Sequence, residues 1–147
     1  MDRATPTAVE TVGDPVRAAT LLHPLRLRIV RELREPDSAT GLARKLNLPR
    51  QKLNYHLREL ENAGFLELVE ERRKGNCTER MVRATATSYL VDPAALGALG
   101  PDPERFQDRF SASYLVALAA RTIQELAILK KRAAKAAKKL GNQGDLF

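Results

Sequence analysis

The spacing of apolar residues changes twice along the chain. From residue 14 to residue 63, apolar side chains recur every three or four positions, which is typical of amphipathic helices. The pattern then predicts two strands, over residues 65–73 and 77–91, joined by a turn at residues 74–76. From residue 104 to residue 140 the helical spacing returns in one unusually long stretch.

Breaks in the first stretch divide it into four helices. Asp14 and the proline after it open the first helix, because Asp caps a helix and Pro suits its first position. Pro24 interrupts the chain, since it lacks the amide donor that an unbroken helix needs. Two further helices are expected over residues 41–46 and 49–63, and Gly64 ends the last of them in left-handed backbone.

These elements predict a fold that is mainly α with a small β-hairpin. The Gly-Pro-Asp-Pro sequence at residues 100–103 is expected to form a hinge, because no regular element continues through it. The predicted organisation is a disordered N-terminal tail over residues 1–13, a compact domain over 14–99, this hinge, a long helix over 104–140 and a disordered C-terminal tail over 141–147.

The third and fourth helices carry the spacing of a helix-turn-helix. Such a unit needs a small residue where its helices touch, and Ala43 stands there. Four positions later it needs a residue that tolerates positive φ, normally Gly, and Asn47 is the next-best choice. Six positions further, Leu53 is the apolar residue that packs the second helix back. With the hairpin that follows, this spacing predicts a winged helix-turn-helix.

The second helix of this unit has a polar outer face. On a helical wheel, Gln51, Tyr55 and Arg58 lie opposite the apolar side. Arg, Gln and Asn side chains match the edges of base pairs in the major groove of DNA. An isolated helix with such a face would only be solvated, but within a helix-turn-helix we expect the face to bind DNA. The predicted DNA-binding residues of this recognition helix are Arg50, Gln51, Lys52, Asn54, Tyr55 and Arg58.

The tip of the predicted hairpin, or wing, carries the consecutive cations Arg72, Arg73 and Lys74. A basic hairpin beside a recognition helix is placed to contact phosphates or the minor groove of DNA. The alternative is a tip that its charge merely keeps soluble, and three nearby glutamates dilute its positive potential. Of the two interpretations we favour DNA contact by these three residues.

Composition agrees with a nucleic-acid partner. The chain has 147 residues and a formal net charge of +7, and such a basic excess attracts polyanions. Cys77 is the only cysteine, so no intramolecular disulfide forms and a reducing compartment is expected. His23 and His56 are the only histidines, and no catalytic or metal-ligand pattern accompanies them. We predict no enzyme activity, no cofactor and no metal site, and we interpret His56 as a packed histidine with a backbone partner.

Two segments, LLHPLRLRIVREL and the stretch from SATGLARKLN to MVRAT, resemble the winged-helix domain of ArsR/SmtB-type transcriptional regulators. The resemblance covers residues 14–93. It implies a homodimer that binds an operator of two-fold symmetry, often as a repressor that a ligand releases. The residues that carry the resemblance are Pro24, Arg26, Leu27, Ile29, His56, Leu57, Ala63 and Gly64.

The chain departs from the metal sensors of that family. Those sensors place cysteines in the first helix of the helix-turn-helix, where this chain has Leu42, Ala43, Arg44 and Lys45. Their other site uses Asp, His and Glu on the C-terminal helix, which has no His here. Metal sensing is therefore not predicted, and the effector stays unknown.

The long C-terminal helix carries a broad apolar stripe. We expect this helix to pair with the same helix of a second subunit, because the compact domain over residues 14–99 is too small to bury the stripe. Packing back onto the chain's own first helix is the alternative. The basic end at residues 130–139 is interpreted as a solvated helix terminus whose cations suit the negative end of the helix dipole. The predicted dimerisation residues are Phe106, Phe110, Tyr114, Leu118, Ile123, Leu126 and Leu129.

The sequence thus predicts a sequence-specific double-stranded DNA-binding transcriptional regulator, a homodimeric repressor on a pseudo-palindromic operator. The alternative is a winged-helix protein–protein interaction module. RNA binding is less favoured, because the deep, narrow major groove of A-form RNA excludes a helix. The longest apolar run, residues 114–120, is too short to cross a bilayer, so we expect a cytoplasmic protein without membrane contact.

Overall fold

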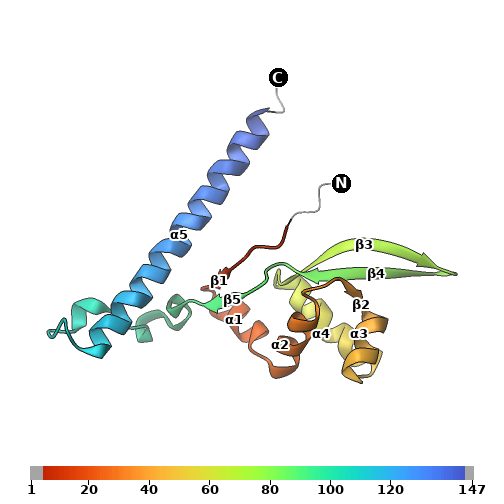
Figure 1. The fold of residues 1–147 in the computed structure, drawn as a ribbon, viewed down its shortest axis with the longest axis horizontal. Helices are drawn as coiled ribbons and strands as arrows, with labels where there is room; N and C mark the ends of the chain where they lie inside the picture. Colours follow the sequence, from red (N-terminus) through yellow and green to blue (C-terminus); the bar gives the residue numbers. More distant parts are fainter. Residues whose placement is uncertain (1–4, 145–147) are drawn as a thin grey trace. The chain divides into compact units, whose positions relative to one another are not determined.

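The structure, a computed structural model, describes residues 5–144 and divides into two compact units, Met1–Leu90 and Val91–Phe147 (Figure 1). The unit boundary therefore falls before the hinge predicted at residues 100–103. The described elements, in chain order, are β1 (Glu10–Val12), α1 (Pro15–Leu21), α2 (Pro24–Glu32), β2 (Asp37–Ser38), α3 (Ala39–Leu46), α4 (Arg50–Asn62), β3 (Leu66–Lys74), β4 (Cys77–Ala84), β5 (Tyr89–Val91), the 3-10 helices η1 (Pro93–Leu99) and η2 (Pro103–Arg105), and α5 (Ala112–Gly144).

Capping side chains define the first two helices. The Asp14 carboxylate accepts hydrogen bonds from the backbone amides of Val16 and Arg17, both at 3.4 Å. Nδ1 of His23 accepts from the backbone amide of Leu25 at 3.2 Å at the start of α2. These bonds satisfy amides that have no partner inside the helices. The cap predicted at Asp14 and the break predicted at Pro24 are confirmed.

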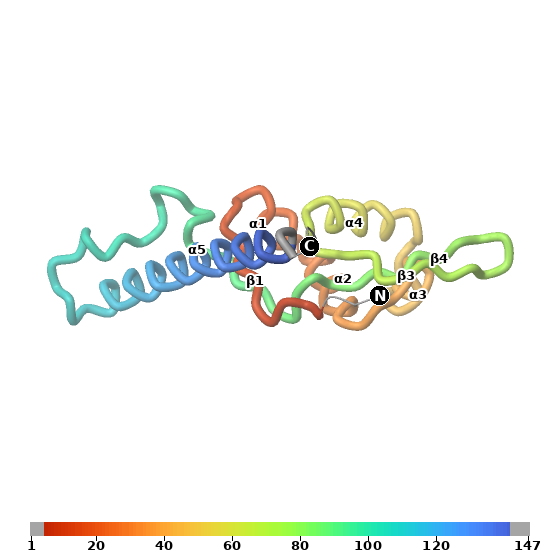
Figure 2. Tube along the Cα trace, turned by 90° about the horizontal axis from the view of Figure 1, so that it is seen from above, coloured from red at the N-terminus to blue at the C-terminus, as the bar shows by residue number. Residues whose placement is uncertain are grey.

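The wing is the antiparallel hairpin of β3 and β4, which extends beyond the helices of its unit (Figures 1 and 2). The short strand β2 pairs with β4, which gives the strand order β2-β4-β3. Lys74 stands opposite Cys77, so Gly75 and Asn76 form the turn, and Gly75 has φ 64°. Gly adopts this left-handed backbone without steric cost, so the predicted hairpin and its turn are confirmed.

The second predicted strand, over residues 77–91, is two strands. β4 ends at Ala84, and β5 leaves the hairpin to pair with β1. The amide of Thr7 also donates to the carbonyl of Thr85 at 3.0 Å, and Val12 is fully buried. The prediction of a disordered tail over residues 1–13 is therefore wrong for residues 5–13, whereas residues 1–4 lie outside the described residues.

The core of the first unit lies where its helices meet the base of the hairpin. Its largest fully buried side chains are aliphatic apart from one phenylalanine, and burying each contributes roughly 1.5–3 kcal/mol. These side chains are Phe65, Ile29, Leu33, Leu42, Leu53, Leu60 and Val12.

Arg17 connects three parts of this unit. Its Nε donates to the carbonyl of Ala63, at the end of α4, at 2.8 Å, and its Nη2 donates to Glu10 at 2.7 Å. Its guanidinium carbon lies 4.6 Å from the ring centroid of Phe65, a cation–π distance. The N-terminal strand is thus attached to the recognition helix through one side chain.

In the second unit, α5 begins at Ala112 and not at residue 104 as predicted. Asp108 accepts a hydrogen bond from the amide of Phe110 at 2.9 Å, and the Ser111 hydroxyl donates to the carbonyl of Asp108 at 2.8 Å. Such local bonds compete with a helix, so this segment forms a turn ahead of α5. At the other end α5 continues to Gly144, so the predicted C-terminal tail is helical over residues 141–144, and residues 145–147 lie outside the described residues.

The length and composition of α5 correct one expectation. By these criteria alone, Ala112–Gly141 would suffice to cross a membrane, with a mean hydropathy of 1.3 over its best window. The prediction that no segment is long enough considered only unbroken apolar runs, whereas Arg121 and Glu125 interrupt this one. An amphipathic helix that pairs with another helix passes the same test, so length alone does not identify a membrane span.

Candidate nucleic-acid interface

Helices α3 and α4 form the predicted helix-turn-helix. The Ser38 hydroxyl caps α3 by accepting from the amide of Gly41 at 3.1 Å. Asn47 ends α3 with φ 53° and ψ 51°, the left-handed conformation that the spacing predicted. The turn lets the amide of Leu48 donate to the carbonyl of Ala43 at 3.0 Å. These contacts fix the direction in which α4 leaves α3.

Helix α4 has one buried side and one exposed side. Leu53, His56 and Leu60 are buried against the rest of the unit. All six predicted DNA-binding residues of α4 are exposed, and Tyr55, the largest, is 56% exposed. The structure therefore leaves the outer face of α4, which we call the recognition face (Gln51, Tyr55 and Arg58), open to solvent.

A cleft of about 260 Å³ separates α4 from β4. Arg50, Asn54 and Arg58 line it from the helix, while Thr78 and Arg80 line it from the wing. Three of the six predicted residues thus face the wing across this cleft. Gln51 and Tyr55 do not line the cleft, so Arg58 is the member of the recognition face that also faces the wing.

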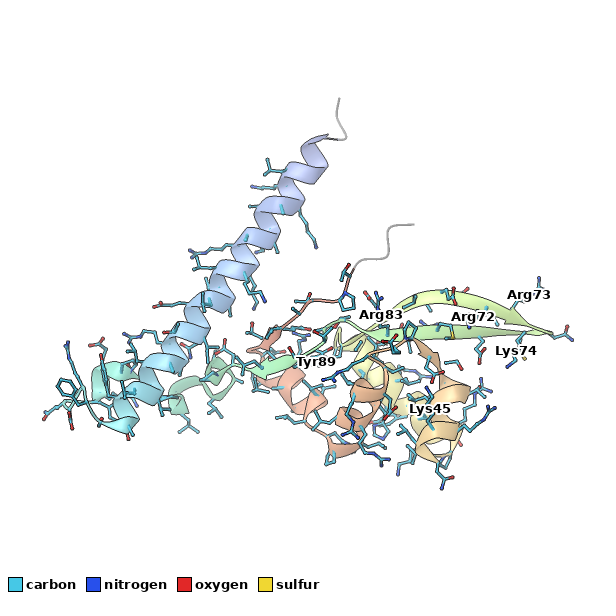
Figure 3. All side chains as sticks on the ribbon, in the orientation of Figure 1. Lys45, Arg72, Arg73, Lys74, Arg83 and Tyr89 are labelled. Atoms are coloured by element: carbon cyan, nitrogen blue, oxygen red, sulfur yellow. The ribbon has the colours of Figure 1, made fainter. Side chains whose placement is uncertain are left out.

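The three predicted wing cations lie at the far end of the hairpin (Figure 3). Arg72, Arg73 and Lys74 are all exposed, but Arg72 also forms an ion pair with Glu70. Part of the charge of Arg72 is therefore neutralised within the strand. The positive potential of the tip rests mainly on the other two side chains.

The cations of the return strand hold the wing in place. Arg80 donates to Glu61 of α4 at 2.6 Å, and this carboxylate raises the pKa of Arg80. Arg83 donates to Glu67 of the neighbouring strand at 2.7 Å. The first of these pairs bridges the recognition helix and the wing, so it orients the two predicted DNA-contacting elements relative to each other.

Sequence reasoning missed two contacts that support the helix-turn-helix. Lys45 of α3 forms an ion pair with Asp37 at 2.8 Å, and its hydrogen bond to Asp37 raises the pKa of Lys45. Arg26 of α2 donates from Nε to Nδ1 of His56 at 3.2 Å, so His56 has a side-chain partner and not the expected backbone one. No periodicity predicts either contact, because both join different elements.

The predicted dimerisation residues fall into three groups. Phe106 and Phe110 precede α5, so they are not on the helix that was expected to carry them. Tyr114 and Ile123 are half-buried on the side of α5 that also carries the buried Ala117 and Ala120. The exposed members are Leu118, Leu126 and Leu129.

The described residues offer little for metal or covalent chemistry. Among residues 5–144, no group of three or more His, Cys, Asp or Glu side chains is placed to hold a metal ion. Cys77 is exposed beside the wing turn. The absence of a cofactor and of metal sensing stays a prediction.

Comparison with known protein families gives a match within the first unit. Residues 21–69 match the family described as a helix-turn-helix domain. The fold is similar to a solved "ArsR-like Transcriptional Regulator from Rhodococcus sp. RHA1", with 22% identity, a TM-score of 0.39 and coverage of 88% of this chain and 89% of that chain. Because both identity and score are low, nothing about function is inferred from that neighbour. No curated protein matches. The family match agrees with the helix-turn-helix that the sequence predicts.

Proposed function

We propose that this protein is a DNA-binding transcriptional regulator of the ArsR-like helix-turn-helix type, which recognises a specific double-stranded sequence, acts as a homodimer and represses transcription. The observation that carries the proposal is the exposed recognition face of α4 beside a basic wing. A helix with this polarity fits the major groove, where bases present distinct donors and acceptors.

The positions of the exposed polar residues on α4 and the wing suggest a division of roles. Gln51, Tyr55 and Arg58 lie on the recognition face and would contact base edges. Arg50 at the start of α4, together with Arg73 and Lys74 at the wing tip, would contact phosphates and set the register of the protein on DNA. Lys52 and Asn54 flank these positions on α4 and would supply further polar contacts.

The proposed homodimer explains the exposed side of α5. Exposed apolar or small residues recur on it at alternating steps of four and three, the spacing of a two-stranded coiled coil. Leu126 and Leu129, at the centre, are 55% and 57% exposed, and a second copy would cover them. This seam differs from the predicted stripe, and its residues are Leu115, Ala119, Thr122, Leu126, Leu129, Ala133, Ala136 and Leu140.

A homodimer would place two copies of α4 in successive major grooves, about 34 Å apart, on a pseudo-palindromic operator. Occupying such a site blocks other proteins without any further contact, which makes repression the simplest outcome. We propose that the protein acts in the cytoplasm. We also propose that its effector is not a metal, because α3 carries Leu42, Arg44 and Lys45 where the metal sensors of the family that the sequence resembles have cysteine ligands.

Binding to duplex DNA across a salt series tests this proposal. The affinity should fall linearly with salt on logarithmic axes, and one sequence should be preferred at every salt concentration. Gln51→Ala with Tyr55→Ala should relax that preference, whereas Gln107→Ala, an exposed Gln outside the helix-turn-helix, should not. Absent or salt-insensitive binding would favour the protein–protein module instead.

A further inference from the structure

Four side chains meet where α4 packs against α2. The rings of His23 and His56 lie 5.0 Å apart between centroids, and the rings of Tyr55 and His56 lie 5.2 Å apart. The Arg26 guanidinium carbon is 5.9 Å from the centroid of Tyr55. This group, which we call the Arg26 cluster (His23, Arg26, Tyr55 and His56), joins a buried residue of α4 to an exposed residue of its recognition face.

Arg26 makes two directional bonds, one within the cluster and one to the backbone of α1. Its Nε donates to Nδ1 of His56 at 3.2 Å, and its Nη1 donates to the carbonyl of Thr20 in α1 at 3.2 Å. The planar guanidinium is thereby fixed in orientation beneath the Tyr55 ring. An exposed aromatic side chain is otherwise free to change rotamer, so the contacts with Arg26 and with the His56 ring favour one orientation of Tyr55.

The bond to His56 exists only when that imidazole is neutral. Nδ1 accepts from Arg26, so the ring carries its proton on Nε2. His56 is only 6% exposed, and this burial, followed by the charges of Arg26, His23 and Lys52, lowers the pKa of His56. Glu59, on the same helix, acts in the opposite direction.

We propose that Arg26 and neutral His56 position Tyr55 and α4 for operator recognition, and that protonation of His56 releases Arg26 and weakens binding in acid. This inference rests on the proposed function, since it concerns the same face of α4. Arg26 acts through Tyr55, so it is a positioning residue. A proton on Nδ1 would place two donors face to face, which breaks the bond and adds charge repulsion.

The direction of the pH effect follows from the lowered pKa. The folded, DNA-competent protein binds the His56 proton less readily than an unfolded chain does, so the contribution of the cluster is complete above pH about 6.5. It is lost as the pH falls through the lower pKa of the folded state. Each pH unit below that pKa weakens binding by up to about tenfold if the protonated form does not bind.

Two Asn substitutions distinguish the contributions of His56 and His23 to the pH dependence of binding. His56→Asn places an amide oxygen near the position of Nδ1, so the acceptor for Arg26 remains while the titration is removed. His23→Asn keeps a residue that caps α2 and removes the other imidazole. The operator affinity of each variant is measured from pH 7.5 to pH 5.0 at constant ionic strength.

Wild type and His23→Asn should both lose affinity as the pH falls through the pKa of His56, by up to about tenfold for each pH unit below it. His56→Asn should bind within about threefold of wild type at pH 7.5 and remain nearly flat on acidification. Arg26→Lys, which keeps the charge but not the planar fork, should discriminate less between operator and mismatched sites at pH 7.5. A His56→Asn variant with the pH profile of wild type would overturn the inference.

A measurement without DNA tests the coupling of Arg26, His56 and Tyr55 independently of the proposed function. In an NMR titration, the Tyr55 ring signals and the Arg26 Nε–H signal should shift with the midpoint of His56, below its usual value, and should not shift in His56→Asn. If the cluster titrates together but no duplex is bound at any pH, the proposed function fails and the coupling stands. If the three signals titrate independently, the coupling fails whatever the DNA data show.

Discussion

Asn47 illustrates how one residue directs the recognition helix. Its left-handed backbone, with φ 53°, turns the chain between α3 and α4, and Leu48 closes the turn through its bond to Ala43. Asn tolerates this conformation because its short polar side chain makes local hydrogen bonds, whereas other side chains crowd the following carbonyl. The position of α4 therefore depends on the backbone preference of one residue.

Asn47→Ala should lower the free energy of unfolding by about 1 kcal/mol, because Ala is strained in left-handed backbone. Asn47→Gly should stay within about 0.5 kcal/mol of wild type, since Gly has no such strain. Urea denaturation with an unchanged slope measures both. Equal stability of the Ala and Gly variants would show that this turn is not the constraint described here.

The sequence predicted the roles of residues that bond to their own or neighbouring backbone. It did not predict contacts between residues that lie far apart in the chain. Asp14 and Gly64 act on their own backbone, so composition and spacing predicted their roles. Arg17 contacts Ala63 across 46 positions, and Arg26 contacts His56 across 30. Only the fold brings such pairs together, which is why the Arg26 cluster has no signature in the sequence.

Among the elements, β1 changes the account of the N-terminus. It is three residues long, too short for an alternating pattern to be visible. It nevertheless pairs with β5, and its last residue, Val12, is fully buried. The first unit thus includes a segment that polarity alone assigns to a tail.

Val12→Ala should lower the free energy of unfolding by about 2 kcal/mol, since it removes two buried carbons and leaves a cavity. Val9→Ala is the matched control: Val9 is 42% exposed, so its loss should change stability by less than about 0.5 kcal/mol. Thermal or urea unfolding gives both values. If Val12→Ala is as stable as the control, this segment does not contribute to the stability of the fold.

The wing is expected to contribute affinity without sequence choice. Arg73→Ala and Lys74→Ala should each weaken binding to all duplexes alike and reduce the slope of affinity against salt by about one. Lys138→Ala removes a cation from the basic end of α5 and should leave the slope unchanged, because that end is interpreted as solvated. A changed preference between sequences would mean that the tip contacts base edges instead.

The start of α5 was predicted eight residues too early, at residue 104 instead of Ala112, because the preceding turn has the apolar spacing of a helix. Apolar residues in the preceding turn, Phe106 and Phe110, continue the helical period by chance. Side-chain bonds around Asp108 and Ser111 hold that turn, and periodicity does not register them. The hairpin and the four earlier helices were predicted because each ends at a cap, a proline or a glycine.

For the whole molecule, the proposed homodimer rests on the seam of α5. Leu126→Glu with Leu129→Glu should convert the protein to monomers, because two charges would face the partner helix. Ile128→Glu is the matched control: Ile128 is 50% exposed on the same helix but lies outside the seam. Sedimentation equilibrium measures the mass of each variant.

Operator affinity should fall about a hundredfold in the monomeric variant, because the second half-site would no longer be bound within one complex. The control should bind as wild type does. A wild-type protein that sediments as a monomer, or that partitions into lipid vesicles through α5, would contradict the homodimer.

The exposed face of α4 is proposed to select a base sequence in duplex DNA. Repeated selection of wild-type complexes from a pool of random duplexes tests this selectivity. We expect an enriched inverted repeat whose half-sites lie about one helical turn apart, and the loss of that enrichment with Gln51→Ala and Tyr55→Ala. A pool that stays random with wild-type protein, or that yields the same repeat with the double variant, would contradict the claim.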